Sequence, residues 1–480
     1  MKALANKIFS ERKMLFSLAA ISIIFLFLFG PLNHYLLKSL YESNYYHLGV
    51  PSLVAAYLAV RGFKDGKEMK ILIIYVAWAV ITRVLNGDRF LLVEGDYLID
   101  LSTMILLFAP GLLLQGEKRR KIYTAVAIVV VIFYFAAALI CIYSAATRTY
   151  LENPIDFRGI GYPNLQENRL NFLSFQYNET AGQFVIAFGM CMLLLFSIKQ
   201  PVIRAVLILA ALADFAAVSL TLSRNGQSCV CIISGLAFGI LVVNGLSKKK
   251  LGFRVAGFII TFIFSAMVIY QLFEPVRYGA WVVYQNQKAT ESSKENEIHA
   301  AKGKYYLTET GMSIQVTELS AANSSSEYRA DERNYFESGR KQIFWSAFKS
   351  LQLEPKRLLI GSGYYHVMDH SHKLITEQAK HFHNTFLQVV NEYGVIGLFL
   401  VLLFYWKTII ISIYMVFCPD GRVKLNEQMM ILVPCALMFY YMLEVGVFKI
   451  VDMADFRNTF FFFSCGMLTG TFQELKRRNA

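Results

Sequence analysis

The sequence has few charged residues for its length. Of its 480 residues, 17% are Asp, Glu, Lys or Arg, whereas 56% are hydrophobic. Soluble globular domains carry about 25% charged residues, so a large water-soluble enzyme is excluded. The apolar residues form uninterrupted blocks of roughly 18 to 25, the length that crosses a bilayer core of about 30 Å. The sequence therefore predicts an all-α polytopic membrane protein.

The long polar segments contain no cysteine. A disulfide framework and a zinc site of the CxxC type are therefore both unsupported. All seven cysteines lie in or beside hydrophobic runs: Cys141, Cys191, Cys229, Cys231, Cys418, Cys435 and Cys465. P-loop, GxGxxG and GxSxG motifs are also missing. No small-x-small cleavage site follows the first apolar run, which ends at Phe29-Gly30-Pro31, so that run is predicted to be a membrane helix rather than a signal peptide.

Hydropathy predicts about twelve transmembrane helices. Their ranges are 14–31, 46–61, 69–86, 97–115, 122–146, 179–198, 202–222, 226–246, 252–273, 385–417, 428–447 and 457–473. The tenth range is too long for one perpendicular span. We expect its first part, His383 to Tyr393, to lie along the interface before Gly394 and Gly397 allow a change of direction.

The net charge of +13 comes from basic clusters in short loops between the apolar blocks. Alternate loops carry the clusters, for example Lys118-Arg119-Arg120-Lys121 and Lys248-Lys249-Lys250, and both ends of the chain are basic. Such clusters mark the cytoplasmic side of a membrane, so both termini are predicted to be cytoplasmic. Topology determination explains the charge, and no nucleic-acid partner is expected.

The predicted topology divides the chain into three parts. Residues 1–273 hold the first nine spans, residues 274–382 form one large extracytoplasmic loop, and residues 383–480 hold the last three spans. Within the loop, apolar residues from Tyr335 to Leu351 recur at helical spacing. The earlier stretch of about 285–330 is polar; it is predicted to recognise a substrate or to act as a lid.

Two arginines stand out on the predicted outer side. Arg224 lies at the outer end of the seventh span, against the positive-inside bias, so it either extends to the interface or binds an anion. Arg340 begins the amphipathic helix of the large loop and is either a solvated surface residue or a second anion ligand. The turn Gly361-Ser362-Gly363 could bring backbone amides near the same anion. Asp214, at mid-membrane depth, favours a structural role in helix pairing.

Five of the eight histidines, from His366 to His383, fall within eighteen residues. His370-x-His372 and His381-x-His383 leave a metal site open, with Asp369 or Glu377 as a further ligand. The other interpretation is that His383 is a general base, because neutral imidazole takes up a proton near pH 7.

The stretch His383-Asn384-Thr385-Phe386-Leu387-Gln388, followed by Glu392-x-Gly394 and Gly397-Leu398, closely resembles the signature of O-antigen ligases and polymerases. Their superfamily includes protein O-oligosaccharyltransferases. Three further segments resemble motifs of the same family: Thr221-Leu222-Ser223-Arg224, Gly339-Arg340 with Trp345 ahead of the turn at Gly361, and Asn178 at the start of an earlier span.

The resemblance implies a GT-C-like glycosyltransferase in the bacterial cytoplasmic membrane, with its active site on the outer face and with no cofactor and no metal. Its donor would be an undecaprenyl-diphosphate-linked glycan, its acceptor a glycolipid or glycan, and its surroundings membrane lipids. Carried over residue by residue, the resemblance makes His383 the catalytic base and Arg224 and Arg340 the diphosphate ligands. Asn384, Glu392, Gly361, Gly363 and Asn178 become supporting residues.

Two questions stay open at this stage. The motifs do not separate a ligase, which we favour slightly, from a polymerase whose acceptor is a second lipid-linked repeat unit. A transporter of lipid-linked glycans also fits twelve spans with intramembrane Arg and Asp, although transporters place such charges near the bilayer midplane.

Overall fold

The computed structural model describes residues 49–87, 95–147, 150–151, 160–161, 170–172, 177–286, 340–353, 355–363, 382–418, 423–444 and 456–479. Within these residues, six helices are long and apolar enough to cross a membrane. They cover Gly116–Thr147, Tyr177–Ser197, Pro201–Leu220, Arg224–Gly245, Leu251–Asn286 and Thr385–Phe417. The protein is therefore a helical membrane protein, as its hydropathy predicts.

The other predicted spans have a mixed outcome. The first, 14–31, lies outside the described residues. The ranges 46–61, 69–86, 97–115, 428–447 and 457–473 coincide with shorter or less apolar helices. These are α4 (Gly49–Asp65), α5 (Lys67–Leu85), α6 (Gly95–Leu113), α17 (Leu425–Gln428) with the 3₁₀ turn η3 (Met429–Ile431) and α18 (Leu432–Met442), and α19 (Phe456–Asn479). The number twelve and the orientation of the bundle stay predictions.

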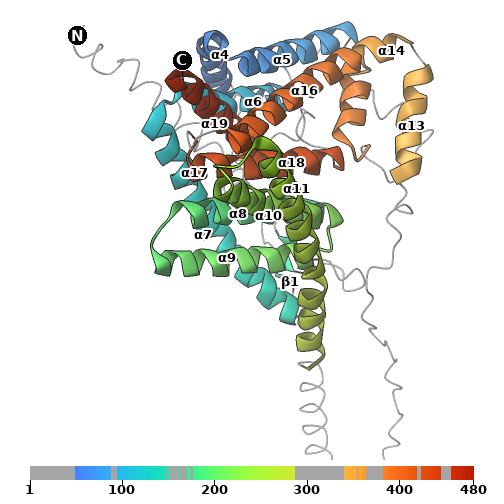
Figure 1. Ribbon diagram of the computed structural model, residues 1–480. Helices are drawn as coiled ribbons and strands as arrows, with labels where there is room; N and C mark the ends of the chain where they lie inside the picture. Colours follow the sequence, from blue (N-terminus) through green and yellow to red (C-terminus); the bar gives the residue numbers. More distant parts are fainter. Residues whose placement is uncertain are drawn as a thin grey trace, which may run out of the picture.

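Helix α8 (Tyr177–Ser197) lies at the centre of the helix bundle. Almost every residue from Asn178 to Leu194 is buried, because α8 packs against α7 (Gly116–Thr147), α9 (Pro201–Leu220), α10 (Arg224–Gly245), α18 and α19. Figure 1 shows these helices gathered around it. The first turn of α8 is therefore fixed from several sides, which positions Asn178.

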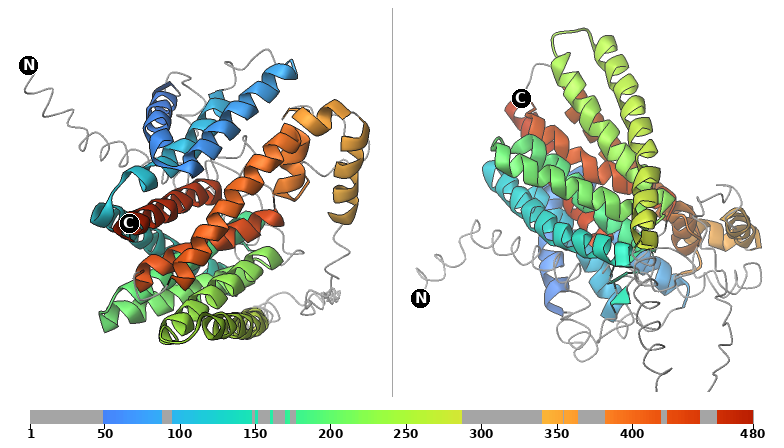
Figure 2. Two further views of the ribbon diagram at one scale, coloured as in Figure 1. Left: turned by 45° about the horizontal axis from the view of Figure 1, so that its top comes forward. Right: turned by 90° about the horizontal axis from the view of Figure 1, so that it is seen from below.

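Helix α11 (Leu251–Gln271) packs on α10 at the edge of the bundle and projects from it (Figures 1 and 2). After a turn at Leu272 the chain is helical again through Asn286. The helical backbone therefore extends about a dozen residues past residue 274, where the loop is predicted to begin, and that boundary stays a prediction. Pro275 explains the interruption, because its ring displaces the carbonyl four residues earlier while the next helix tolerates proline in its first turn.

A three-stranded antiparallel sheet lies between α7 and α8, which the all-α prediction did not include. It pairs β1 (Tyr150–Leu151) with β2 (Ile160–Gly161), and β2 with β3 (Asn171–Phe172). The amide of Phe172 donates to Thr180 Oγ1 at 2.9 Å, so β3 is attached to the first turn of α8.

Helix α16 (Thr385–Phe417) is bent at Gly394, whose φ of 68° and ψ of −173° are not helical. The predicted change of direction at this glycine is confirmed. The bend divides α16 into a short arm, residues 385–393, and a long arm, residues 395–417. Two helices of the predicted large loop, α13 (Arg340–Leu353) and α14 (Pro355–Ile360), pack against α16 at one side of the bundle (Figure 2).

Candidate functional site

His383 and Asn384 lie directly before the short arm of α16. Asn384 caps this helix, because its side-chain oxygen accepts a hydrogen bond from the amide of Leu387 at 2.9 Å. His383 has a φ of 50°, in the left-handed region that residues other than glycine rarely adopt. Among the described residues, Leu222 is the one other non-glycine residue with a positive φ. Such strain concentrates at functional sites, and both positions belong to motifs that the sequence singled out.

The imidazole of His383 contacts a buried carboxylate. Its Nδ1 lies 3.1 Å from Oε1 of Glu444, whose side chain is 5% exposed, whereas that of His383 is 25% exposed. An ionised carboxylate only accepts hydrogen bonds, so in a neutral His383 imidazole this contact places the proton on Nδ1 and leaves the lone pair on Nε2. A base oriented by a third group in this way is the arrangement that general-base catalysis uses.

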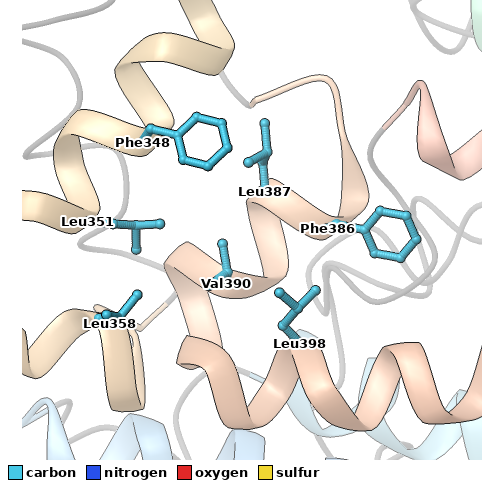
Figure 3. A pocket seen from close by; sticks show the side chains of 7 residues that line it. All are labelled: Phe348, Leu351, Leu358, Phe386, Leu387, Val390 and Leu398. Carbon is cyan, nitrogen blue, oxygen red and sulfur yellow. The ribbon is translucent and has the colours of Figure 1, made fainter.

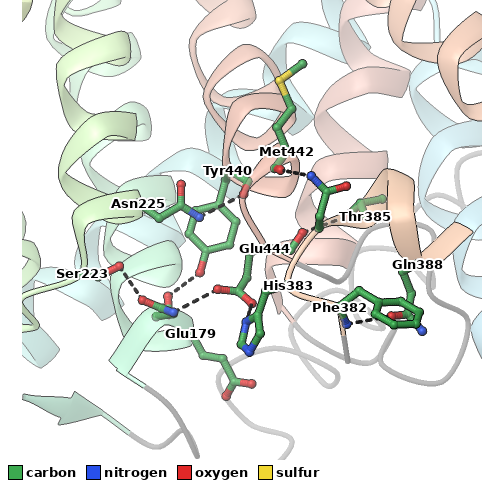
Figure 4. A network of polar contacts seen from close by, with 12 residues as sticks. Glu179, Ser223, Asn225, Phe382, His383, Thr385, Gln388, Tyr440, Met442 and Glu444 are labelled. Carbon is green, nitrogen blue, oxygen red and sulfur yellow. Dashed lines mark hydrogen bonds and ion pairs between the residues drawn. The ribbon is translucent and has the colours of Figure 1, made fainter. Parts of the chain in front are cut away.

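Glu444 also joins His383 to two other helices. Its Oε2 accepts a hydrogen bond from Asn178 Nδ2 at 2.9 Å, and Asn178 Oδ1 accepts one from Ser223 Oγ at 2.8 Å. Figure 4 shows this chain running from Ser223 to Glu444 and His383. The network therefore brings together three segments that are far apart in the sequence: the start of α8, the Thr221–Arg224 segment and the start of α16.

The starts of α10 and α16 are fixed by caps on either side of this network. Ser223 is the N-cap of α10 and accepts a hydrogen bond from the amide of Gly226 at 3.2 Å. Arg224 is thus the first residue of α10 and is partly exposed. At α16, Asn384 Nδ2 donates to the carbonyl of Met442 at 2.6 Å, and Thr385 Oγ1 donates to that of Glu444 at 2.9 Å.

The starts of α8, α10 and α16 consequently converge on one region. The N-terminal end of a helix carries a partial positive charge and has amide groups without intrahelical acceptors. Three such ends together with Arg224 favour the binding of an anion in this region. The Glu444 carboxylate places a negative charge beside His383.

A buried arginine, Arg457, supports the same region from α19. Its Nη1 donates to the Tyr440 hydroxyl at 2.8 Å, and that hydroxyl donates to the carbonyl of Asn178 at 2.6 Å. Its Nη2 lies 3.7 Å from Oε1 of Glu179. Neither Arg457 nor Glu444 was among the predicted site residues. Both are ionisable residues near the ends of predicted spans, and that signal could have found them.

The turn Gly361-Ser362-Gly363 has a packing role. Its three amides donate to the carbonyls of Arg357, Asn391 and Glu392, at 2.8, 2.8 and 3.1 Å respectively. The idea that these amides approach an anion is therefore wrong. Instead, the turn lies against the bend of α16, so closely that a Cβ on Gly361 would lie 2.2 Å from the carbonyl oxygen of Glu392.

Glu392, a predicted supporting residue, lies in the short arm of α16. Its Oε1 accepts from Gln388 Nε2 at 2.5 Å, and Gln388 Oε1 accepts from the amide of Phe382 at 3.2 Å. Glu392 therefore acts through Gln388 to fix the position of Phe382, the residue that precedes His383 in the chain.

Three predictions concern residues whose details lie outside the described part of the structure. Arg340 begins α13, as expected, but its side chain is outside that part. The histidines of the cluster other than His383 are also outside it, and so is the segment from 287 to 339.

Among the described residues, no group of three His, Cys, Asp or Glu side chains is placed to hold a metal ion. Asp214 is fully buried in α9 and contacts Cys191 Sγ at 3.6 Å.

A scan against protein-family models, a search of curated proteins and a search of solved structures each find no match to this chain.

Proposed function

We propose that the protein is a membrane glycosyltransferase of the O-antigen ligase type. It transfers a saccharide from undecaprenyl diphosphate to an acceptor hydroxyl at the outer face of the bacterial cytoplasmic membrane. One observation carries the proposal: His383, oriented by a buried carboxylate, is joined by hydrogen bonds to Asn178 and Ser223. These residues belong to segments that resemble motifs of one superfamily, and they meet in space.

In this proposal His383 removes the proton from the acceptor hydroxyl. The Nε2 lone pair takes that proton while the acceptor oxygen attacks the anomeric carbon of the donor saccharide. The bond between the anomeric carbon and the diphosphate oxygen breaks, and undecaprenyl diphosphate leaves with the bonding electrons. Attack from the face opposite the leaving group inverts the anomeric configuration. Glu444 stabilises the imidazolium that forms.

Arg224 and Arg340 bind the diphosphate and stabilise its developing negative charge. A guanidinium group presents a planar fork to phosphate oxygens and stays charged at physiological pH. The converging starts of α8, α10 and α16 favour the same anion. Loss of one preorganised donor of this kind raises a barrier by about 3 kcal/mol, or roughly a hundredfold in rate.

A transfer assay with purified protein and a lipid-diphosphate donor tests the proposal. We expect His383→Ala, Arg224→Ala and Arg340→Ala each to lower transfer about a hundredfold or more, because each removes a group that acts on the reacting atoms. The control is Arg204→Ala, which removes an exposed arginine at the start of α9 and should leave the rate unchanged. Wild-type rates in all three site variants would exclude the mechanism, and loss of activity on adding a chelator would restore the metal interpretation.

The same assay separates a ligase from a polymerase by product size. A polymerase makes a ladder from lipid-linked repeats alone, whereas a ligase adds saccharide to a distinct acceptor only when that acceptor is supplied.

A transporter of lipid-linked glycans is the rival from another class. The network of His383, Glu444, Asn178 and Ser223 lies at the starts of α8, α10 and α16, three helices that are each long and apolar enough to span a membrane. We therefore expect it near one membrane face, which favours an enzyme over a carrier with a midplane site. If His383→Ala abolished movement of the lipid across the membrane and left glycan transfer intact, the transporter would be correct.

A further inference from the structure

An apolar pocket of about 550 Å³ lies between the large loop and the bent helix α16. Its volume is within the range of roughly 300–1,000 Å³ that is usual for ligand sites. Figure 3 shows the side chains of α13 and α14 on one side and those of α16 on the other. All seven lining residues are apolar: Phe348, Leu351, Leu358, Phe386, Leu387, Val390 and Leu398.

The pocket lies on the face of the short arm of α16 that is opposite the polar network. Phe386, Leu387 and Val390 line the pocket, whereas Thr385 and Gln388 make the hydrogen bonds that tie this arm to Glu444 and Phe382. At about 100° per residue, these two sets occupy opposite faces of the helix. A ligand in the pocket therefore contacts the helix that follows His383 without lying against the imidazole.

The pocket lies next to an exposed apolar face of α16. Leu398 lies one turn into the long arm, next to Val395, Phe399 and Leu402, whose side chains are exposed. Exposed apolar side chains on a membrane helix face lipid tails. Trp345 of α13 is 63% exposed, and tryptophan is enriched at the level of the lipid headgroups.

The two helices on the loop side of the pocket carry exposed lysines. Lys349 of α13 and Lys356 of α14 are exposed and lie close to the lining residues Phe348 and Leu358 in the sequence. Exposed ammonium groups beside a membrane attract anionic lipid headgroups, and each contributes about 1 kcal/mol near a membrane surface.

We propose that this pocket binds one acyl chain of an anionic phospholipid of the surrounding leaflet, with its phosphate held by the lysines of α13 and α14. The lipid fills the space between the loop helices and the short arm of α16, and so supports the helix on which His383 depends. Lipid binding at this pocket does not depend on glycan transfer.

Photocrosslinking of the full-length protein in phosphatidylcholine nanodiscs tests the proposal. The probe is phosphatidylglycerol with a photoactivatable group on its acyl chain. We expect crosslinks in peptides from α13, α14 and the short arm of α16. Leu358→Trp fills the pocket and should lower this labelling at least fivefold. Leu359→Trp is the matched control, because Leu359 is exposed beside the pocket without lining it, and its labelling should equal that of the wild type.

The charge requirement has its own variant pair. Lys349→Glu with Lys356→Glu should lower labelling by phosphatidylglycerol at least fivefold, whereas Lys248→Glu with Lys249→Glu should not change it. Equal labelling by a phosphatidylcholine probe would overturn the choice of an anionic lipid. Displacement of the probe by undecaprenyl phosphate, at amounts where phosphatidylglycerol has no effect, would assign the pocket to the carrier chain instead. Labelling that misses these three helices would overturn the site itself.

Discussion

Glu444 determines which nitrogen of His383 can act as a base. In Glu444→Gln the amide can donate to Nδ1 as well as accept from it, so the productive tautomer loses its preference. We expect glycan transfer to fall about a hundredfold, the lower end of the usual general-base contribution. The measurement is kcat across pH 5 to 9, together with the midpoint of thermal unfolding to confirm folding.

Glu444→Asp is the matched variant for this prediction, because it keeps the charge and shortens the side chain. Partial recovery of transfer relative to Glu444→Gln would support a positioning role for the carboxylate. A wild-type rate and pH profile in Glu444→Gln would show that His383 acts without it.

Gly394 allows the bend of α16, and we expect Gly394→Ala to destabilise the protein. Its φ of 68° strains any residue with a side chain, and a Cβ would lie 2.1 Å from the carbonyl oxygen of Leu359. Left-handed strain alone costs about 1–3 kcal/mol. The control is Gly279→Ala, where nothing lies within 4 Å and the helix should gain slightly. Thermal unfolding in detergent measures both, and equal midpoints would contradict the argument.

At the level of single residues, the sequence singled out some of the residues that the network brings together. His383 and Arg224 were singled out from a histidine cluster and from an arginine at the outer end of a predicted span, and Asn178 and the Ser223-Arg224 segment from their resemblance to family motifs. Glu444 and Arg457 were missed because each lies near the end of a long apolar run. Such a run is interpreted as a membrane span from its length, and the single charged residue near its end receives no weight. Their roles depend on contacts between helices, which no local pattern encodes.

At the level of elements, α6 and α19 pack with almost no space between their backbones. A Cβ on Gly466 would lie 2.2 Å from the carbonyl oxygen of Phe108, and one on Gly470 would lie 2.0 Å from that of Gly111. Small residues four apart allow such an approach between membrane helices. Gly466→Leu should therefore separate the two helices and cost about 1–3 kcal/mol or more.

The same thermal assay tests this packing. Gly245→Leu, at the open end of α10, places the same side chain where nothing lies within 4 Å and should change stability by less than about 0.5 kcal/mol. An unchanged midpoint in Gly466→Leu would show that α6 and α19 can separate without loss.

Periodicity predicted the helices well and their ends less well. The hydropathy of the ninth span falls near residue 273, yet the chain stays helical to Asn286, because Pro275 lies in a position that a new helix tolerates. The small sheet between α7 and α8 was not predicted, because strands of two residues are too short to show an alternating pattern.

At the scale of the whole molecule, the order of the helices around α8 could not be predicted, since neighbours such as α6 and α19 are distant in sequence. Hydropathy says which segments are buried from water, but it does not distinguish a lipid-facing helix such as α11 from a central one such as α8. That distinction comes from packing, and it decides which polar residues can meet.

The orientation of the molecule in the membrane yields the last prediction. Residues 251–279 of α11 and its continuation rise about 42 Å at 1.5 Å per residue, which exceeds the bilayer core of about 30 Å. Ser247 and Gly279 are exposed and should therefore lie on opposite sides. Six of the seven native cysteines are buried and Cys435 is partly buried, so background labelling should be low. A membrane-impermeant maleimide should label Gly279→Cys in intact cells and Ser247→Cys only after permeabilisation. The reverse pattern would place the His383 network on the cytoplasmic side and exclude transfer at the outer face.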